Sequence, residues 1–350
     1  MDVLRNGILV SPGKGRHKNI GDYIQSIAAR QFAGSDPLML HREHLDEYSG
    51  EKVRTVMNAW FMSNPRNFPP SPSVNPLFVS FHVTPPIEKE FFTPRTIEYL
   101  KRYEPIGCRS EDVVDMLERH GISGKFTSCL TLTLGRSYRH HEVSTARPIF
   151  VDPFYRRPAK VSVLGFCGYI IKRTPYILGH FRAVKILAHR FRVFSVLPCS
   201  RFAAVRWAYA AEFHRAYTSF FTEEVLLTAE YVTHKLKRRP DFCDEVLMNI
   251  ADEMLHYYEK APFVVTSRLH CALPCTAMGT PVWVVFDQEM ATGRFRGNLN
   301  FLNILRLDSS GRIHAPIDGK IGVEDRPPVR TDHIPYADAL SKCVTEFFER

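Results

Sequence analysis

The sequence predicts an α/β fold in which parallel sheets carry helices on both faces. Over residues 1–135, β-branched runs alternate with amphipathic stretches of helical period, and the second half repeats this alternation less regularly. At 350 residues the chain is too long for one ordinary core and suits two domains of about 150 residues each. Two domains usually enclose a cleft, and clefts are where ligands bind.

The elements of the first half follow from local patterns. Strands are expected over 7–12, 53–61, 76–83 and 126–134, and helices over 21–32, 93–103 and 110–121. Thr93 and Ser110 are expected to cap the last two helices, and Gly121 to end the third. The Pro-rich stretch 64–76 continues neither element and is expected to be a loop.

The second half centres on a strand-helix-strand unit over 264–286, which follows an amphipathic helix expected over 241–261. In that helix Val246, Ile250 and Met254 recur at helical spacing and are expected to face the core. A final helix over 336–350 carries apolar residues at the same spacing, so we expect it to dock on the body of the protein.

The charge of the chain is unevenly distributed. A formal net charge of +9 favours anionic partners such as phosphorylated metabolites, nucleic acid or anionic lipid. Twelve Lys or Arg and one acid, Glu212, lie between Arg156 and Arg215, so the excess is concentrated there. The overlapping segment 165–221 is basic, aromatic and poorly periodic, without a repeat.

Cysteine usage and hydropathy predict the compartment. Eight cysteines form no CxxC pair and sit mostly in apolar stretches, so we expect reduced core cysteines, no zinc site and a cytosolic protein. Cys271 and Cys275 have i,i+4 spacing but no further ligand at metal-binding spacing. No run of 18 or more apolar residues occurs, and the first residues lack the pattern of a signal peptide.

Several enzyme classes lose support because their motifs are missing. The sequence has no GxxxxGK[ST], no GxGxxG after a strand, no GxSxG and no HExxH. These absences argue against a P-loop kinase, a dinucleotide-dependent dehydrogenase, an esterase and a zinc protease.

Candidate binding residues lie in loops that lead from strands into helices, where parallel sheets bind ligands. The first loop holds Asn19, Gly21 and Asp22 before an expected helix, whose free N–H groups suit an anion or sugar hydroxyls. The alternative is that Asp22 only stabilises the positive end of that helix, which contributes about 0.3 to 1 kcal/mol.

A second group follows the middle strands. His82 ends an expected buried strand, and Arg109 stands just before a helix cap. His82 is either a substrate ligand or a hydrogen-bonded structural group. Arg109 either meets an anion or pairs with Glu111 or Asp112.

The third group lies in the strand-helix-strand unit. Ser267, Arg268 and His270 follow a strand and precede a helix of small residues that can pack closely on the sheet. The Arg fork and the helix N-terminus both favour carboxylate or phosphate, and a neutral imidazole transfers protons near pH 7. Arg294 and Gly297 follow the next strand, where Arg294 is either a second basic group for the same pocket or a solvated side chain.

Five longer blocks of the sequence carry a further signal: NIGDYIQSIAARQF, EPIGCRSEDVVDMLERHGISGKFTSCLTLTL, AEYVTHKL, ADEMLHYYEKAPFVVTSRLHCALPCTAMGTPVWVV and GRFRGNLNFL. Each is unspecific alone, but in this order, across residues 19–303, they resemble the polysaccharide pyruvyl transferase family. The resemblance implies a glycosyltransferase-B-like architecture, in which two Rossmann-like domains with parallel sheets face each other across a central cleft.

The resemblance also implies a domain division and a reaction. The expected units are an acceptor-side domain at 1–145, a phosphoenolpyruvate-binding domain at 146–330 that includes the basic helical segment, and a docking helix at 331–350. The implied reaction moves the pyruvyl group of phosphoenolpyruvate onto two hydroxyls of a sugar, as a ketal, with release of phosphate. This reaction serves the assembly of exopolysaccharide, capsule or cell-wall glycan.

The resemblance assigns roles to residues of this chain. The family's Arg-Leu-His motif corresponds to Arg268, Leu269 and His270, which are expected at the phosphoenolpyruvate site together with Arg294. His270 is the candidate proton donor, and Asp22 and His82 are candidates for handling the acceptor hydroxyls. Further candidates are Asn19, Gly21, Arg109, His234 and Gly297. The reaction needs one acid and one base, so we expect no cofactor and no metal besides the co-substrate phosphoenolpyruvate.

Other interpretations stay open. A nucleotide-sugar-dependent glycosyltransferase of the same fold class is the main alternative. Nucleic-acid binding is less well supported, because no RNP, zinc-finger or helix-turn-helix pattern occurs. The segment 165–221 is either an insertion that packs as helices or a contact with a membrane that carries a lipid-linked oligosaccharide acceptor. We expect a cytoplasmic protein, held peripherally at the inner face of the membrane under the second interpretation.

Overall fold

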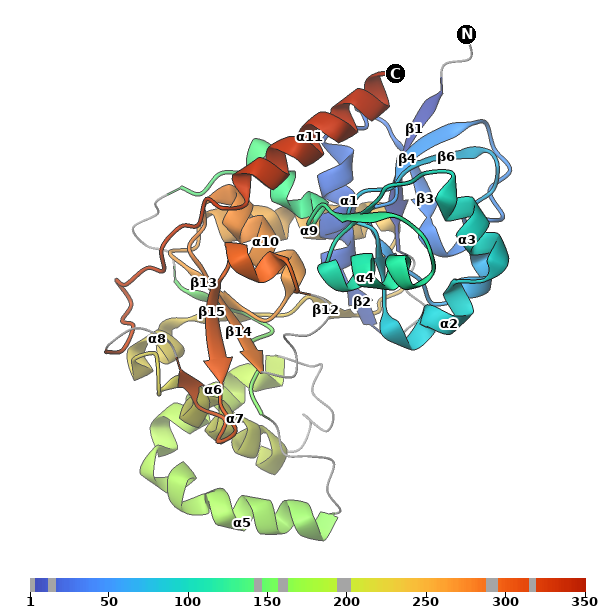
Figure 1. Cartoon of the computed structure of the whole chain (residues 1–350). Coiled ribbons are helices and arrows are strands. Elements are labelled where there is room, and N and C mark those ends of the chain that lie inside the picture. The colour runs from blue at the N-terminus through green and yellow to red at the C-terminus, as the bar shows by residue number, and fades with distance from the viewer. Residues whose placement is uncertain are drawn as a thin grey trace.

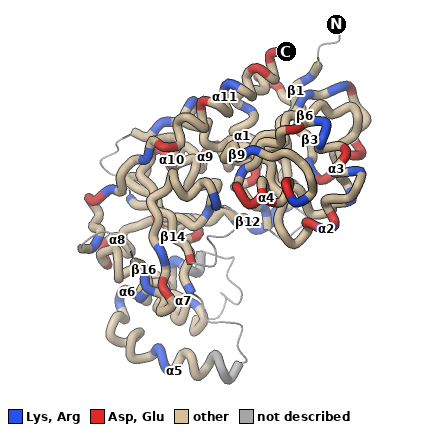
Figure 2. Tube along the Cα trace, in the orientation of Figure 1, with Lys and Arg blue, Asp and Glu red and all other residues tan. Residues whose placement is uncertain are grey.

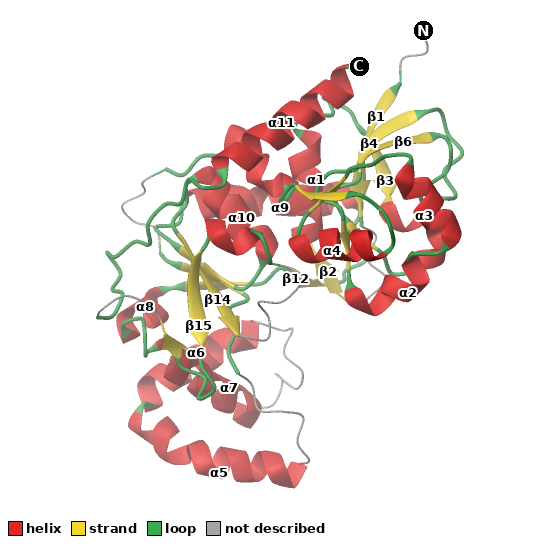
Figure 3. Cartoon of the chain, in the orientation of Figure 1, coloured by secondary structure: helices red, strands yellow, loops and turns green. Residues whose placement is uncertain are grey.

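The computed structural model describes residues 4–11, 17–141, 147–156, 163–193, 203–287, 295–314 and 319–350. The chain is a mixed α/β protein with parallel sheets, as the alternation of strand and helix patterns predicts (Figures 1 and 3).

A four-stranded parallel sheet forms the centre of the first half. Its strand order is β3-β1-β4-β6. The strands are β1 (Arg5–Val10), β3 (Leu38–His41), β4 (Val53–Val56) and β6 (Val74–Leu77). In β1, Ile8 and Val10 face one core cluster and Leu9 faces another, which is the period-2 alternation of a strand buried on both faces.

Two short parallel pairs form separate two-stranded sheets in the first half. They are β5 (Trp60–Phe61) with β7 (His82–Val83), and β8 (Ile106–Cys108) with β9 (Gly124–Phe126). The strands expected over 53–61 and 76–83 are each split in two. In the second of them Ser80 has φ +56°, a left-handed conformation that cannot continue a strand.

Within the described residues of the first half, the α-helices are α1 (Ile20–Arg30), α2 (Glu88–Phe91), α3 (Pro94–Lys101) and α4 (Glu111–Arg119). Thr93 caps α3 as expected, because its side chain accepts a hydrogen bond from Thr96 N. Ser110 occupies the N-cap position of α4 but makes no capping bond through its side chain. Gly121, just beyond α4, has φ +68°, which suits a glycine after a helix end.

The strand expected over 126–134 is wrong. Only Phe126 belongs to β9, and Leu130–Arg136 form a 3-10 helix, η4. Ser128 has φ +62°, which ends the strand, and Thr133 Oγ1 donates to Leu130 O at 2.8 Å within the turn. The apolar and β-branched run is buried against α1, α10 (Leu269–Met278) and α11 (Ile334–Glu349), so burial rather than sheet pairing accounts for its composition.

The second half holds a six-stranded sheet in the order β11-β10-β13-β14-β15-β16. The strands are β10 (Ile149–Val151), β11 (Glu230–Val232), β13 (Val264–Thr266), β14 (Val282–Asp287), β15 (Asn303–Leu307) and β16 (Ile313–His314). All neighbouring pairs are parallel except β15 with β16. Ile149, Val264 and Val284 face one core cluster, while Phe150, Val265 and Val285 face another.

Helices cover both faces of this second sheet. One face carries α9 (Asp244–Glu259) and α10 (Leu269–Met278), and the other carries α6 (Phe181–Val193), α7 (Ala203–Tyr217) and α8 (Glu223–Thr228) (Figure 1). The expected apolar face of α9 lies at the margin of its buried face. Ile250 and Met254 are partly buried and pack against the core cluster, Val246 is partly buried, and Leu247, Ala251 and Leu255 are buried in the cluster.

The two halves are joined by backbone pairing and a shared core. β2 (His17–Asn19) pairs antiparallel with β12 (Lys235–Lys237), and Ile20 N donates to His234 O at 2.8 Å. One hydrophobic cluster runs from β1 and α1 to α9, α10 and β13. The C-terminal helix α11 (Ile334–Glu349) packs against η4, and Arg54 Nη1 donates to Phe347 O at 3.3 Å.

The basic segment 165–221 is largely helical where the structure describes it. Helix α5 (Val163–Gly179) lies outside α6 and α7, at the end of the molecule farthest from α1 to α4 (Figure 1). In the described part of the chain no helix combines the length and apolarity needed to cross a membrane. Among the described residues, further 3-10 helices are η1 (Arg42–His44), η2 (Pro65–Asn67), η3 (Pro85–Ile87) and η6 (Asn298–Phe301).

Burial of the cysteines departs in part from expectation. Cys108, Cys129, Cys271 and Cys275 are free and buried in the core. The expectation of a core position is wrong for Cys167 and Cys243, which are exposed. Cys199 lies outside the described residues.

Candidate active site

A cavity of about 910 Å³ is lined by residues that follow strands of both halves. In the first half these residues are Gly21 and Asp22 after β1 and β2, Arg42 after β3, Trp60 after β4, His82 after β6 and Arg109 after β8. In the second half they are His234 after β11 and Ser267, Arg268 and His270 after β13. The cavity thus lies at the carboxyl ends of parallel strands, where such sheets bind ligands.

Arg268 stands at the N-cap of α10 and is held by a carboxylate. Its Nε donates to Asp152 Oδ2 at 2.9 Å, and the same oxygen accepts the backbone N–H of His234 at 3.0 Å. Burial opposes ionisation of Asp152, but attraction by Arg268 and the His234 hydrogen bond bring the pKa of its carboxyl below the usual value. The guanidinium is therefore anchored through Nε, and its side chain remains about 30 % exposed at the cavity.

Ser267 and Thr266 fix the turn that carries Arg268. Thr266 Oγ1 donates to Val151 O at 2.9 Å and accepts from Arg268 N at 3.0 Å. Ser267 Oγ donates to Val285 O at 2.7 Å and accepts from Phe154 N at 2.8 Å. The loop is thus tied to the neighbouring strands on each side of β13, which makes it a rigid support.

His270 meets an arginine from the other half of the chain. Its Nε2 lies 3.3 Å from Arg109 Nη1, which also donates to Gln25 Oε1 at 3.3 Å. His270 has φ −81° and ψ +15°, so α10 is kinked at this residue. When Arg109 donates to Nε2, the ring proton of a neutral His270 lies on Nδ1.

Arg109 is buried, and its backbone accepts a hydrogen bond from a buried asparagine. Only 4 % of the residue is exposed, and its backbone oxygen accepts from Asn298 Nδ2 at 2.8 Å. Asn298 Oδ1 in turn accepts from Ser128 Oγ at 2.6 Å. The neighbouring Gly297 has φ +85°, and a side chain there would meet the Phe126 ring at 2.7 Å. Gly297 therefore serves close packing and does not line the cavity.

The first turn of α1 packs closely on two histidines. A Cβ atom added to Gly21 would lie 3.2 Å from His234 Nδ1 and 3.2 Å from His270 Cβ. His234 is buried, and its Nε2 lies 2.7 Å from Tyr258 OH. Burial lowers the pKa of His234 to about 4, although Asp152 acts in the opposite direction, so the ring is neutral at pH 7.

A second polar group lines the first-half side of the cavity. Asp22 Oδ2 lies 3.6 Å from Arg42 Nη2, and the Arg42 guanidinium stacks over the Trp60 ring at 5.2 Å. Trp60 Nε1 donates to Thr84 Oγ1 at 3.3 Å, and the cavity wall continues through Pro85 and Pro86. His82 is 3 % exposed and also contributes to the lining.

The structure brings most of the sequence-predicted residues together in this one cavity. Its lining includes Asn19, Gly21, Asp22, His82, Arg109, His234, Arg268, Leu269 and His270. Gly297 is not among them, and Arg294 lies outside the described residues. Spacing alone could not show that loops so far apart in sequence share one site.

Sequence reasoning missed four residues around the cavity. The cavity is lined by two of them from the first half, Arg42 and Trp60. Gln25 accepts a hydrogen bond from Arg109, and Asp152 anchors Arg268. Arg42 and Asp152 directly follow strands, and this position could have indicated them. Gln25 lies inside α1 and carried no such signal.

A comparison with known protein families shows to which family the chain is related. The sequence profile of one family, polysaccharide pyruvyl transferase, matches residues 66–286. The chain belongs to this family. The matched stretch contains His82, Arg109, Arg268 and His270, while Gly21 and Asp22 precede it.

Membership of the polysaccharide pyruvyl transferase family supports a role in pyruvyl transfer during polysaccharide biosynthesis, with a sugar or polysaccharide as acceptor. Comparison with curated proteins and with solved structures gave no match.

Proposed function

We propose that this pyruvyl transferase moves the pyruvyl group of phosphoenolpyruvate onto two hydroxyls of one sugar, forming a ketal and releasing phosphate. The observation that carries the proposal is the convergence of Arg268, His270 and Arg109 at one cavity. Two guanidinium groups and an imidazole line the same cavity, and the two guanidinium groups come from different halves of the chain.

Phosphoenolpyruvate carries two anionic groups, a phosphate and a carboxylate, and this cavity offers matching donors. Arg268 and the N-terminus of α10 face it from the second half, and Arg109 faces it from the first. Asp152 anchors Arg268 through Nε. The two terminal nitrogens of the guanidinium can then donate hydrogen bonds to an oxyanion.

The chemistry follows from the residues that line the cavity. A proton donated to the methylene carbon of phosphoenolpyruvate makes C2 electrophilic, and His270 is the donor we assign. One sugar hydroxyl attacks C2, the bond from C2 to the phosphate oxygen breaks, and the second hydroxyl closes the ketal. Of the two hydroxyl protons released, one balances the proton gained by the methyl group and the other leaves with phosphate.

The acceptor sugar is assigned to the first-half side of the cavity. Asp22 or His82 would accept a hydroxyl proton, and the Trp60 ring with Pro85 and Pro86 would contact the sugar face. Asn19 and His234 complete the polar lining between the two sides. Arg294, which follows β14 in the sequence, would extend the anion site, and no cofactor or metal is assigned to the transfer step.

We further propose that the two halves form Rossmann-like domains in a glycosyltransferase-B-like arrangement, with residues 1–145 on the acceptor side and 146–330 on the phosphoenolpyruvate side. Parallel strands, ligand residues at their carboxyl ends and a cavity shared by both halves support this assignment. The shared core and the β2–β12 pair would limit opening of the cavity.

A peripheral membrane contact through α5 and α6 is proposed for a cytoplasmic protein with a lipid-linked acceptor. Ile171, Leu178 and Phe181 are exposed large apolar residues, and these two helices contain Lys and Arg without any acid (Figure 2). Apolar and basic side chains together suit an anionic bilayer surface. Co-sedimentation with anionic vesicles should fall on Arg182→Ser combined with Lys185→Ser, and equal binding would contradict the contact.

Ligand binding tests the proposed function and separates it from its main alternative. Phosphoenolpyruvate should raise the thermal transition of the wild type, and the increase should be lost in Arg268→Ala. Stabilisation by a uridine or guanosine diphosphate sugar, with no response to phosphoenolpyruvate, would instead indicate a nucleotide-sugar glycosyltransferase.

A further inference from the structure

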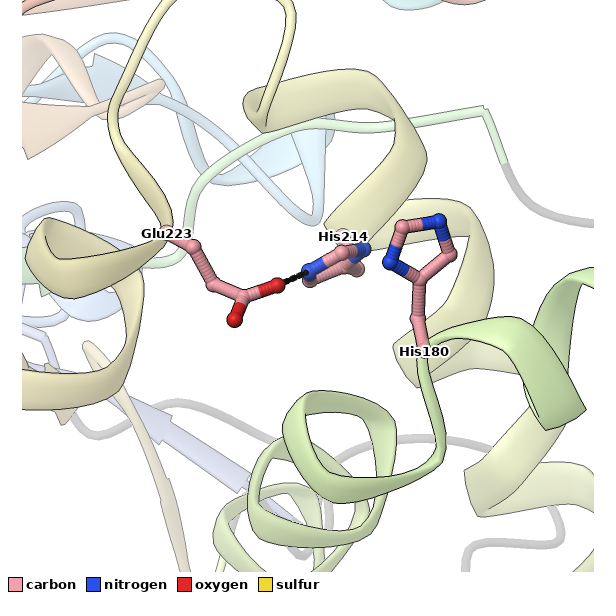
Figure 4. A group of neighbouring side chains, drawn as sticks. All are labelled: His180, His214 and Glu223. Carbon is pink, nitrogen blue, oxygen red and sulfur yellow. Dashed lines mark hydrogen bonds and ion pairs between the residues drawn. The ribbon is translucent and has the colours of Figure 1, made fainter.

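Two histidines and a glutamate lie together on the far side of the second sheet from α9 and α10. His180 is the single residue between α5 and α6, His214 lies in the last turn of α7, and Glu223 begins α8. One ligand atom from each lies within 4.8 Å of the other two. Figure 4 shows the Glu223 carboxylate meeting the His214 ring, with the His180 ring on the other side of His214. None of the three lines the cavity described above.

The centre of this cluster is a buried imidazole with a partner on each nitrogen. The His214 side chain is 1 % exposed, its Nε2 lies 2.8 Å from Glu223 Oε2, and its Nδ1 lies 2.8 Å from Tyr176 OH. Metal-binding histidines usually donate their second ring N–H to an oxygen that fixes the ring orientation. Tyr176 OH can play that part when Nε2 binds a metal ion.

The same contacts satisfy the site without an ion. Nε2–H of His214 then donates to Glu223, and Tyr176 OH donates to Nδ1. A metal can therefore enter by a change of tautomer, with no buried polar atom left unpaired.

The types of ligand atom in the cluster indicate which metal ion it would bind. Two imidazoles and one carboxylate suit zinc and similar ions, whereas Mg²⁺ and Ca²⁺ prefer oxygen ligands. Zinc ligands at about 2.1 Å in a tetrahedron are separated from each other by about 3.4 Å, so the cluster has to contract. His180 and Glu223 are exposed and can rotate inward, while the buried His214 stays in place.

We propose that His180, His214 and Glu223 bind one zinc ion, with water in the fourth position. The ion would link the corner between α5 and α6 to α7 and to α8, whose Val225 and Leu226 lie in the core beneath the sheet. A zinc ion here would fix the basic helices in place, and the proposal does not depend on the function assigned to the cavity. The i,i+4 cysteine pair, buried in α10, takes no part in it.

Zinc titration of the chelator-treated 350-residue chain tests this site. Competition with a chromogenic chelator should show one zinc ion per chain and no competition by Mg²⁺. His180→Ala and Glu223→Gln should each weaken zinc binding at least tenfold, and Tyr176→Phe about tenfold through the ring partner. His189→Ala is the matched control, because His189 is an exposed histidine of α6 outside the cluster, and it should bind zinc as the wild type does.

Circular dichroism shows whether each variant is folded, and both substituted ligands are exposed, so folding should persist. The proposal is overturned if the wild type takes up no zinc. It is also overturned if folded His180→Ala and Glu223→Gln bind zinc as tightly as the wild type. In either case the cluster is a hydrogen-bonded contact between helices only.

Discussion

Substitution of Gly21 by Ala tests whether the close packing of α1 positions His270. The added Cβ would lie 3.2 Å from His270 Cβ and 3.2 Å from His234 Nδ1, whereas carbon atoms pack best at about 3.5 to 4.0 Å. His234 is held by Tyr258 and by the backbone bond to Ile20, so it cannot easily yield. We therefore expect His270 to move by about 0.5 Å.

The substitution should change kcat more clearly than it changes the free energy of unfolding. A misplacement of about 1 Å can lower a rate about a hundredfold, so a shift half as large should lower kcat about tenfold. Overpacking costs about 1 to 3 kcal/mol, but Ala in a helix regains about 0.5 to 1 kcal/mol over Gly. The free energy of unfolding should therefore fall by at most about 2.5 kcal/mol, and kcat is the decisive quantity.

Gly168→Ala provides the matched control for this experiment. Gly168 lies inside α5, and an added Cβ would meet no atom within 4 Å. It should stabilise the chain by about 0.5 to 1 kcal/mol and leave kcat unchanged. Both variants are compared by phosphate release from phosphoenolpyruvate and by urea unfolding. Wild-type kcat in Gly21→Ala would refute the positioning role.

Three further predictions concern packing, pH and anion binding. Gly135→Ala should destabilise the chain by at least about 3 kcal/mol in urea unfolding, because the new Cβ would overlap the backbone oxygen of Ala277. The pKa of His234 is about 4 in the folded state and near 6.5 in the unfolded state, so between these values only the unfolded state binds the proton. The contribution of His234 to the free energy of unfolding is therefore complete above pH 6.5 and falls by up to about 1.4 kcal/mol per pH unit as pH drops toward 4. Denaturation at several pH values should show that the free energy of unfolding depends less steeply on pH in His234→Gln. Asp152→Asn weakens the anchor of Arg268, so the KM for phosphoenolpyruvate should rise about tenfold while kcat changes little; an unchanged KM would count against the anchor.

The strands and loops of the site were predictable where local chemistry decides them. Arg268 and His270 follow a short β-branched run and precede small residues, and this pattern alone indicates a strand, a loop and a helix. Their position at the carboxyl end of β13 then follows from the geometry of parallel sheets. The resemblance to the family added the expected ligand, which spacing could not supply.

What the sequence could not predict depends on tertiary packing. The run at 126–134 has the composition of a buried strand, and only its contacts with α1, α10 and α11 make η4 a 3-10 helix. The contact between Arg109 and His270 spans 161 positions in the chain and requires both sheets to be placed. The zinc-ligand cluster likewise joins three helical segments whose spacing matches no local motif.

Acceptor-dependent release of phosphate from phosphoenolpyruvate is the measurement that tests the central claim most directly. A panel of sugars is incubated with the protein, phosphate is measured, and the sugar is examined for a pyruvate ketal by mass spectrometry. We predict one phosphate for each ketal formed with a suitable sugar, and a loss of at least a hundredfold in Arg268→Ala and His270→Ala. Phosphate release that needs no acceptor, or that Arg268→Ala leaves unchanged, would contradict the assignment of this cavity.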